Sequence, residues 1–110
     1  MKKLNIIKKQ SEIDYVIKKG KMYKNNFFYV YNIYNKESKY YRFCICVSKK
    51  LGNAVIRNKN KRQIKDIIDK SNLVFNNTND YVIILRKEIN NLDYNEIKEN
   101  LINLISKIID

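Results

Sequence analysis

The sequence predicts a single two-layer α+β domain in which three helices and three strands follow the order αββαβα. Its 110 residues at 13.3 kDa suit one domain, and helical and strand-like apolar patterns alternate along the chain. Because 45% of the residues are hydrophobic and none is Pro, the chain can fill one core and lacks the composition of a disordered segment. No linker or repeat interrupts the sequence, so we expect the domain to span residues 1–110.

The first predicted element is a short helix over residues 11–19. Ile13, Val16 and Ile17 recur there at helical spacing. Gly20 follows directly, and glycine suits the left-handed conformation in which many helices end. We therefore expect Gly20 to be a left-handed C-cap.

Two strand-like segments come next, and the short turn between them predicts a hairpin. Residues 26–34 are rich in aromatic and β-branched side chains, which favour strands. Residues 40–48 alternate, so successive side chains should point to opposite faces of a sheet. One predicted face carries Tyr41, Phe43, Ile45 and Val47, and the other carries Arg42, Cys44, Cys46 and Ser48.

The second half of the chain predicts a helix, a central strand and a final helix. Asn53 is a suitable N-cap for a helix over residues 54–70, whose apolar stripe would be Ile56, Ile64, Ile67 and Ile68. Residues 81–85 are apolar on both faces, as in a strand covered on both sides. Asp93 and Glu96 have the spacing of a capping box before a stripe that comprises Tyr94, Ile97, Leu101, Leu104, Ile105 and Ile108.

Missing residue types exclude several kinds of site. Because the chain has no His, it cannot use a Ser–His nucleophile pair, a His general base or His metal ligands. Cys44 and Cys46 are too few for a structural zinc site and point to one side of a strand, where they cannot bridge without distortion. We expect them to be small apolar groups. No apolar stretch suits a signal peptide or a membrane span, so we expect a cytoplasmic location without a membrane partner.

The charge of the chain is strongly basic and unevenly distributed. The formal net charge is +12, with +15 in residues 1–65 and −3 in residues 66–110. A basic half of this kind is typical of a surface that meets a polyanion, so nucleic acid is the leading partner class. A membrane surface is the competing partner, but the apolar residues follow core periodicities and leave no face for lipid.

Residues 47–66, VSKKLGNAVIRNKNKRQIKD, carry the densest pattern of charge. A strand ends, a glycine turns the chain, and a helix begins whose first-turn N–H groups favour anions. Arg57, Lys61 and Lys65 follow at spacings of four, with Asn58 and Arg62 alongside. Like charges at this spacing cost a helix about 0.2 to 0.5 kcal/mol per pair unless they are neutralised, which indicates a phosphate partner.

This segment resembles the bacterial ribonuclease P protein family. The family motif is roughly R-N-R-x-K-R-x-x-R after V-S-K-K-x-G-x-A-V, and residues 57–65 read RNKNKRQIK after VSKKLGNAV. Asn60 stands where the family usually has an aliphatic residue. The resemblance extends over nearly the whole chain, from the first helix to the DYVIILRK strand and the last helix.

The resemblance implies both a fold and a function. The implied fold is like domain 2 of ribosomal protein S5, with a mixed central sheet and a left-handed βαβ crossover at the basic helix. The implied function is that of the protein subunit of ribonuclease P, which binds the catalytic RNA and the 5′ leader of precursor tRNA. The RNA with Mg²⁺ would cut the leader, so the protein would contribute no catalytic residue and bind no metal or cofactor alone. We expect the free protein to be a monomer.

The family's functional positions carry over residue by residue. The RNA-binding set would be Lys49, Lys50, Arg57, Asn58, Lys59, Lys61, Arg62 and Lys65. The leader cleft between the first helix and the sheet would contain Ile13, Ile17, Tyr31, Arg42 and Cys46. Tyr31 would stack on a leader base.

Each assignment has an alternative from the residues alone. The basic helix could be a solvated surface, and Ile13, Ile17 and Tyr31 could simply be core residues. Two other functions also fit the charge: a general RNA-binding or ribosome-associated protein, and a small toxin-type endoribonuclease that works without a metal. The toxin class predicts cleavage by the protein alone, whereas a general binder predicts no dependence on a catalytic RNA.

Overall fold

The computed structural model describes residues 1–109 and forms one α+β domain around a four-stranded sheet. In chain order the elements are η1 (Lys3–Asn5), α1 (Gln10–Lys19), β1 (Lys21–Lys24), β2 (Phe28–Tyr34), β3 (Arg42–Cys46), η2 (Lys49–Leu51), α2 (Ala54–Lys70), β4 (Asn79–Leu85), η3 (Lys87–Asn91) and α3 (Tyr94–Ile109). The predicted order is confirmed, with the short strand β1 added. No helix within residues 1–109 is long and apolar enough to cross a membrane.

The sheet is mixed, as expected, but the predicted hairpin is wrong. The strand order is β1-β2-β4-β3, with β3 parallel to β4 and the other neighbours antiparallel. Thus β4 lies between β2 and β3 and pairs with a strand at each edge. Its side chains are apolar on both faces, which suits a central strand covered on both sides. The hairpin is formed instead by β1 and β2. The β1 sequence KMYK is mostly exposed and lacks apolar alternation, so no pattern indicated a strand there.

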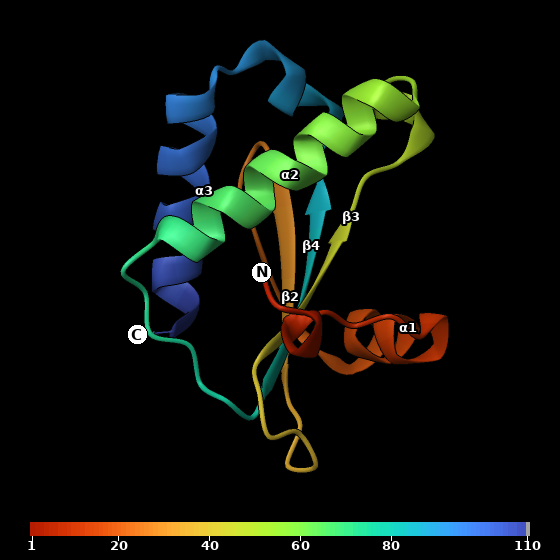
Figure 1. Cartoon of the computed structure of the whole chain (residues 1–110), viewed down its shortest axis with the longest axis vertical. Helices are drawn as coiled ribbons and strands as arrows, with labels where there is room; N and C mark the ends of the chain where they lie inside the picture. Colours follow the sequence, from red (N-terminus) through yellow and green to blue (C-terminus); the bar gives the residue numbers. More distant parts are fainter. Residues whose placement is uncertain (110) are drawn as a thin grey trace.

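The connection from β3 through α2 to β4 has the rare hand. In Figure 1 both strands point upwards, α2 crosses on the near side of the sheet, and β4 lies to the left of β3. A crossover of this geometry is left-handed, against the usual rule for βαβ units. The fold feature that the resemblance implied is therefore present.

Helices cover both faces of the sheet. On one face, Phe28, Phe43 and Ile83 pack with residues of α2 and α3 into the larger core. On the other face, Val82 packs with Ile13 and Val16 of α1. The sheet with α2 and α3 forms the two predicted layers, and α1 adds a short third layer on the other face. Strand β4 is covered on both sides, as predicted.

An aromatic cluster closes the larger core near the start of β4. Phe43 stacks on Tyr81 with ring centroids 4.7 Å apart, and Phe75 meets Phe43 edge-on at 5.1 Å. Phe75 is buried although it lies in the Asn-rich loop before β4. This polar loop is thereby fixed to the core by one aromatic side chain.

The predicted caps are confirmed except at Gly20. The Asn53 side chain accepts a hydrogen bond from the N–H of Ile56 at 3.0 Å. Asp93 and Glu96 exchange the two bonds of a capping box. Gly20, however, has φ −75°, not a left-handed value. A glycine is needed there because a Cβ would lie 2.5 Å from the carbonyl oxygen of Val16.

Candidate nucleic-acid interface

A short connection that contains η2 and a tight turn at Gly52 joins strand β3 to the basic helix α2. Gly52 has φ +146°, which favours glycine, and an added Cβ would lie 2.9 Å from the side chain of Ile56. Asn53 then caps the first turn of α2. The lysines of η2 and the cations of α2 therefore follow each other along one stretch of surface.

Seven cations of the predicted RNA-binding set lie on this stretch, which we call the basic face. They are Lys49, Lys50, Arg57, Lys59, Lys61, Arg62 and Lys65, and each is exposed or half-buried. Within residues 1–109 none of them forms an ion pair; the cations that do are the N-terminus, Arg42, Lys70 and Arg86. The Nε of Arg57 is buried without a hydrogen-bond partner. The basic face thus carries charge and a donor that the described part of the protein does not satisfy.

The opposite side of α2 holds the helix on the core, with two differences from the predicted stripe. Ile64, Ile67 and Ile68 are buried as expected. Ile56 is exposed, whereas Asn60 is buried. Because Ile56, Asn60 and Ile64 are spaced by four residues, they lie on the same side of α2. Asn60 occupies a buried position of that stripe, whereas Ile56 in the first turn is left exposed.

Most of the predicted leader cleft comes together on the α1 face of the sheet. Ile13, Ile17, Tyr31 and Cys46 share the smaller apolar cluster between α1 and the strands. Ile13 is only 8% exposed, so its main contribution is packing. Ile17, Tyr31 and Cys46 are half-buried and keep some accessible surface.

Arg42, the predicted cation of the cleft, is held by two carboxylates. Its guanidinium donates to both oxygens of Asp80, at 2.9 and 2.8 Å, and to Glu12 of α1 at 2.8 Å. Hydrogen bonding to the buried Asp80, and then to Glu12, raises the pKa of Arg42 above its ordinary value. Arg42 therefore fastens α1 to the sheet, and its charge is already neutralised.

A hollow of about 470 Å³ lies beside this ion pair, at the end of β2. Tyr15 and Tyr34 line it, and both are exposed, at 56% and 66%. None of the five predicted cleft residues lines the hollow. Sequence reasoning missed these tyrosines because Tyr15 lies on the outer side of its helix and Tyr34 at the end of its strand, where periodicity carries no signal.

The pKa values of the two cysteines are shifted in opposite directions, although both side chains are half-buried. Their sulfurs are 3.7 Å apart. The hydrogen bond from Cys44, with the nearby charge of Lys61, lowers the pKa of Cys46 to about 7. The same hydrogen bond and burial raise the pKa of Cys44 above its ordinary value.

Sequence comparison relates the chain to known proteins over nearly its full length. The family model described as Ribonuclease P matches residues 1–109. The ribonuclease P protein component of Listeria innocua is 39% identical over 105 residues, which cover 96% of this chain and 88% of that protein. The chain belongs to the ribonuclease P protein family. It is thus a subunit of the ribonuclease P endoribonuclease, an enzyme of tRNA processing.

Solved structures of ribonuclease P proteins have the same fold. The protein from Staphylococcus aureus is similar with a TM-score of 0.84 and 35% identity, and the match covers 96% of this chain and 98% of that one. The protein from Thermotoga maritima has a TM-score of 0.80 and 30% identity, with 92% and 94% covered.

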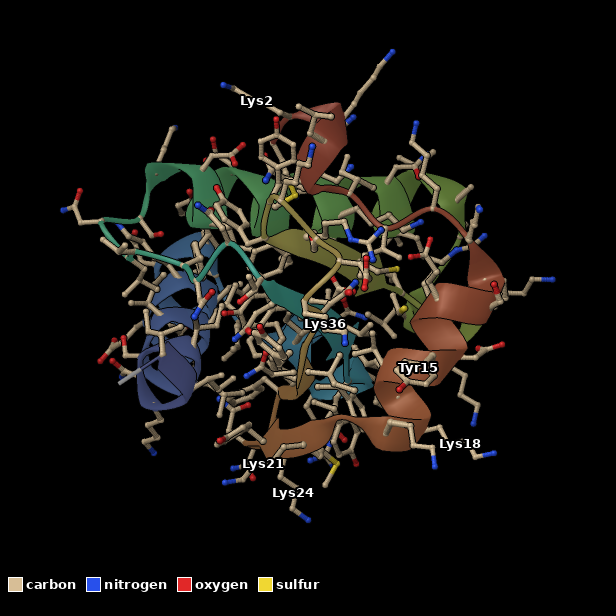
Figure 2. All side chains as sticks on the ribbon, turned by 90° about the horizontal axis from the view of Figure 1, so that it is seen from below. Lys2, Tyr15, Lys18, Lys21, Lys24 and Lys36 are labelled. Atoms are coloured by element: carbon tan, nitrogen blue, oxygen red, sulfur yellow. The ribbon has the colours of Figure 1, made fainter. Side chains whose placement is uncertain are left out.

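Positive charge in this ribonuclease P protein extends beyond the basic face. Lys2, Lys18 and Lys24 reach outward from three different parts of the ribbon in Figure 2, and all three are exposed. These lysines add to the general attraction for a polyanion. They do not form a patterned row like that of α2.

We predict that Arg42→Met strongly destabilises the protein. It would leave the buried Asp80 carboxylate without its cation, a loss of about 3 to 5 kcal/mol in the free energy of unfolding. Glu12→Gln is the matched control, because Glu12 is more accessible than Asp80 and loss of its charge should cost at most about 1 kcal/mol. Urea denaturation measures both. An equal, small loss in the two variants would show that Arg42 does not fasten α1.

Proposed function

We propose that the chain binds the catalytic RNA of ribonuclease P through its basic face, together with Asn58. The observation that carries this proposal is the row of seven cations without a carboxylate partner among the described residues. Their mutual repulsion is relieved when phosphates approach, and the counterions released from the RNA add to the affinity. Family membership supports RNA as the polyanion.

We further propose that the α1 face of the sheet binds the 5′ leader of precursor tRNA. Ile17, Tyr31 and Cys46 offer a half-buried apolar surface there, on which an unpaired base can stack. Ile13 and Arg42 support this surface from below, Ile13 by packing and Arg42 by its ion pairs. Tyr31 is the aromatic residue of the set and would contribute most to stacking.

In this proposal the RNA subunit carries the cleavage chemistry. No cleavage step is assigned to a side chain of this protein. The Mg²⁺ of the holoenzyme belongs with the RNA. The protein contributes placement and charge neutralisation, as a cytoplasmic monomer until it meets its RNA.

Reconstitution tests the function directly. Purified protein is incubated with precursor tRNA at low Mg²⁺, with and without ribonuclease P RNA, and the 5′ ends are mapped. We expect the mature 5′ end only when the RNA is present, formed faster than by RNA alone. Cleavage by the protein alone would identify a toxin-type endoribonuclease. Absence of stimulation would leave a general RNA-binding protein.

Single cations of the basic face should each contribute one phosphate contact. Arg57→Ala or Arg62→Ala should weaken binding to ribonuclease P RNA by about 10-fold and reduce the salt slope of log K by about 1. Lys98→Ala on α3 is the matched control, since it removes the same charge from an exposed position off the basic face. Equal effects of all three variants would mean that only the net charge matters.

A substitution of Tyr31 distinguishes binding of the leader from binding of the rest of the precursor tRNA. Tyr31→Ala should weaken binding of precursor tRNA to the holoenzyme by roughly 1 to 3 kcal/mol, the worth of one stacked base, with little effect on mature tRNA. Tyr31→Phe keeps the ring and should bind like the unmodified protein. Equal losses for both tRNAs would remove Tyr31 from the leader site.

A further inference from the structure

The sulfur chemistry of Cys44 and Cys46 has no role in the function proposed above. Both thiols are free and half-buried on the same face of β3, and their sulfurs are 3.7 Å apart. Two thiols at this distance can pack as small apolar groups, close into a disulfide, or serve as a pair of ligands for one soft ion. Their geometry disfavours the disulfide and leaves the pair of ligands as the arrangement with chemical consequence.

A disulfide between them is disfavoured by the strand. Two residues apart in an extended strand, the Cα atoms are separated by roughly 6.6 Å, near the upper limit for a disulfide, and the side chains run parallel instead of converging. Bond formation would have to bring the sulfurs from 3.7 Å to about 2.05 Å. Because β3 is held by its pairing with β4, this closure would distort the sheet.

The observed spacing fits a bridging metal ion instead. Two thiolates bound at about 2.3 Å in tetrahedral geometry, as on zinc, place their sulfurs about 3.8 Å apart. We propose that Cys44 and Cys46 form a two-thiolate site for a thiophilic divalent d10 cation of the size of zinc. The inference does not rest on RNA binding, although Cys46 also lies in the proposed leader surface and Lys61 and Lys65 also belong to the basic face.

The hydrogen bond with Cys46 and burial raise the pKa of Cys44, so the Cys44 proton has to leave when a cation binds to both sulfurs. Lys61 and Lys65 line the same small hollow as Cys44, about 160 Å³ in volume. Their positive charges favour the deprotonated sulfurs. Two thiolates together neutralise a divalent cation, so the bound state places no net charge among the apolar neighbours of the pair.

The site would be open and exchangeable. Within residues 1–109 no third Cys, Asp, Glu or His joins the pair, which leaves the remaining positions of the ion to water or another small ligand. Structural zinc sites fill all four positions with protein ligands. The ion is therefore not needed for folding, in contrast to the ion of a zinc finger.

Metal titration of the reduced, untagged protein tests the site. The chain has no His, so imidazole does not compete. Zn²⁺ affinity is measured against a chromophoric chelator, and Cd²⁺ is followed by its ultraviolet thiolate charge-transfer band. We expect one ion per chain and a band of two thiolates. A stoichiometry of one ion per two chains, or no band, would overturn the proposal.

Cys44→Ser and Cys46→Ser provide matched variants of nearly equal size. Removing a residue that only hydrogen-bonds a metal ligand typically lowers metal affinity about 10- to 100-fold. Removing a ligand itself should cost at least as much, so each variant should lose at least ~100-fold in Zn²⁺ affinity. The double variant should lose the charge-transfer band. Unchanged Zn²⁺ affinity in the double variant would overturn the proposal. If a variant fails to fold, alkylation of the unmodified protein decides: Zn²⁺ should protect both thiols from iodoacetamide, and no protection would refute the site.

Discussion

Burial of strand β4 is the constraint on which the rest of the fold depends. Five of its seven residues are buried, so it needs a neighbour at each edge and cover on each face. Strands β2 and β3 occupy the edges, α1 covers one face, and α2 with α3 covers the other. A parallel neighbour requires a long crossover, and α2 is that crossover. The packing of the sheet therefore also fixes where the basic helix lies.

The two sides of α2 explain how a helix keeps so many unpaired cations. Ile64, Ile67 and Ile68 are almost completely buried, and each buried side chain of this size contributes about 1.5 to 3 kcal/mol. Repulsion between cations four residues apart costs only about 0.2 to 0.5 kcal/mol per pair. Core packing outweighs this repulsion severalfold. The basic face can therefore stay charged in the free protein without unwinding the helix.

Features set by local sequence were predictable, whereas features set by distant contacts were not. Asn53 and the capping box at Asp93 depend on neighbours within three residues, and both were predicted. The pairing of β4 with β2 and β3 joins residues 38 to 57 positions apart, as from Arg42 to Asp80 and from Phe28 to Leu85, so a short turn suggested the wrong hairpin. Position 20 requires glycine because the carbonyl oxygens of Val16 in α1 and Asn32 in β2 leave no room for a Cβ. For the site, residue types indicated the basic face, but only the three-dimensional structure shows which cations have carboxylate partners.

Ion pairs determine which charges of the chain are available to a polyanion. Arg42 counts as a free cation in the sequence, yet two carboxylates hold it. The same contacts occupy Glu12 and the buried Asp80, which would otherwise repel RNA near the α1 face. One guanidinium and two carboxylates leave this cluster with a net charge of −1, so Arg42 offsets one of the two negative charges and offers none of its own to RNA. Attraction for a polyanion then comes from the cations without an ion pair among residues 1–109, and seven of these follow one another closely on η2 and α2.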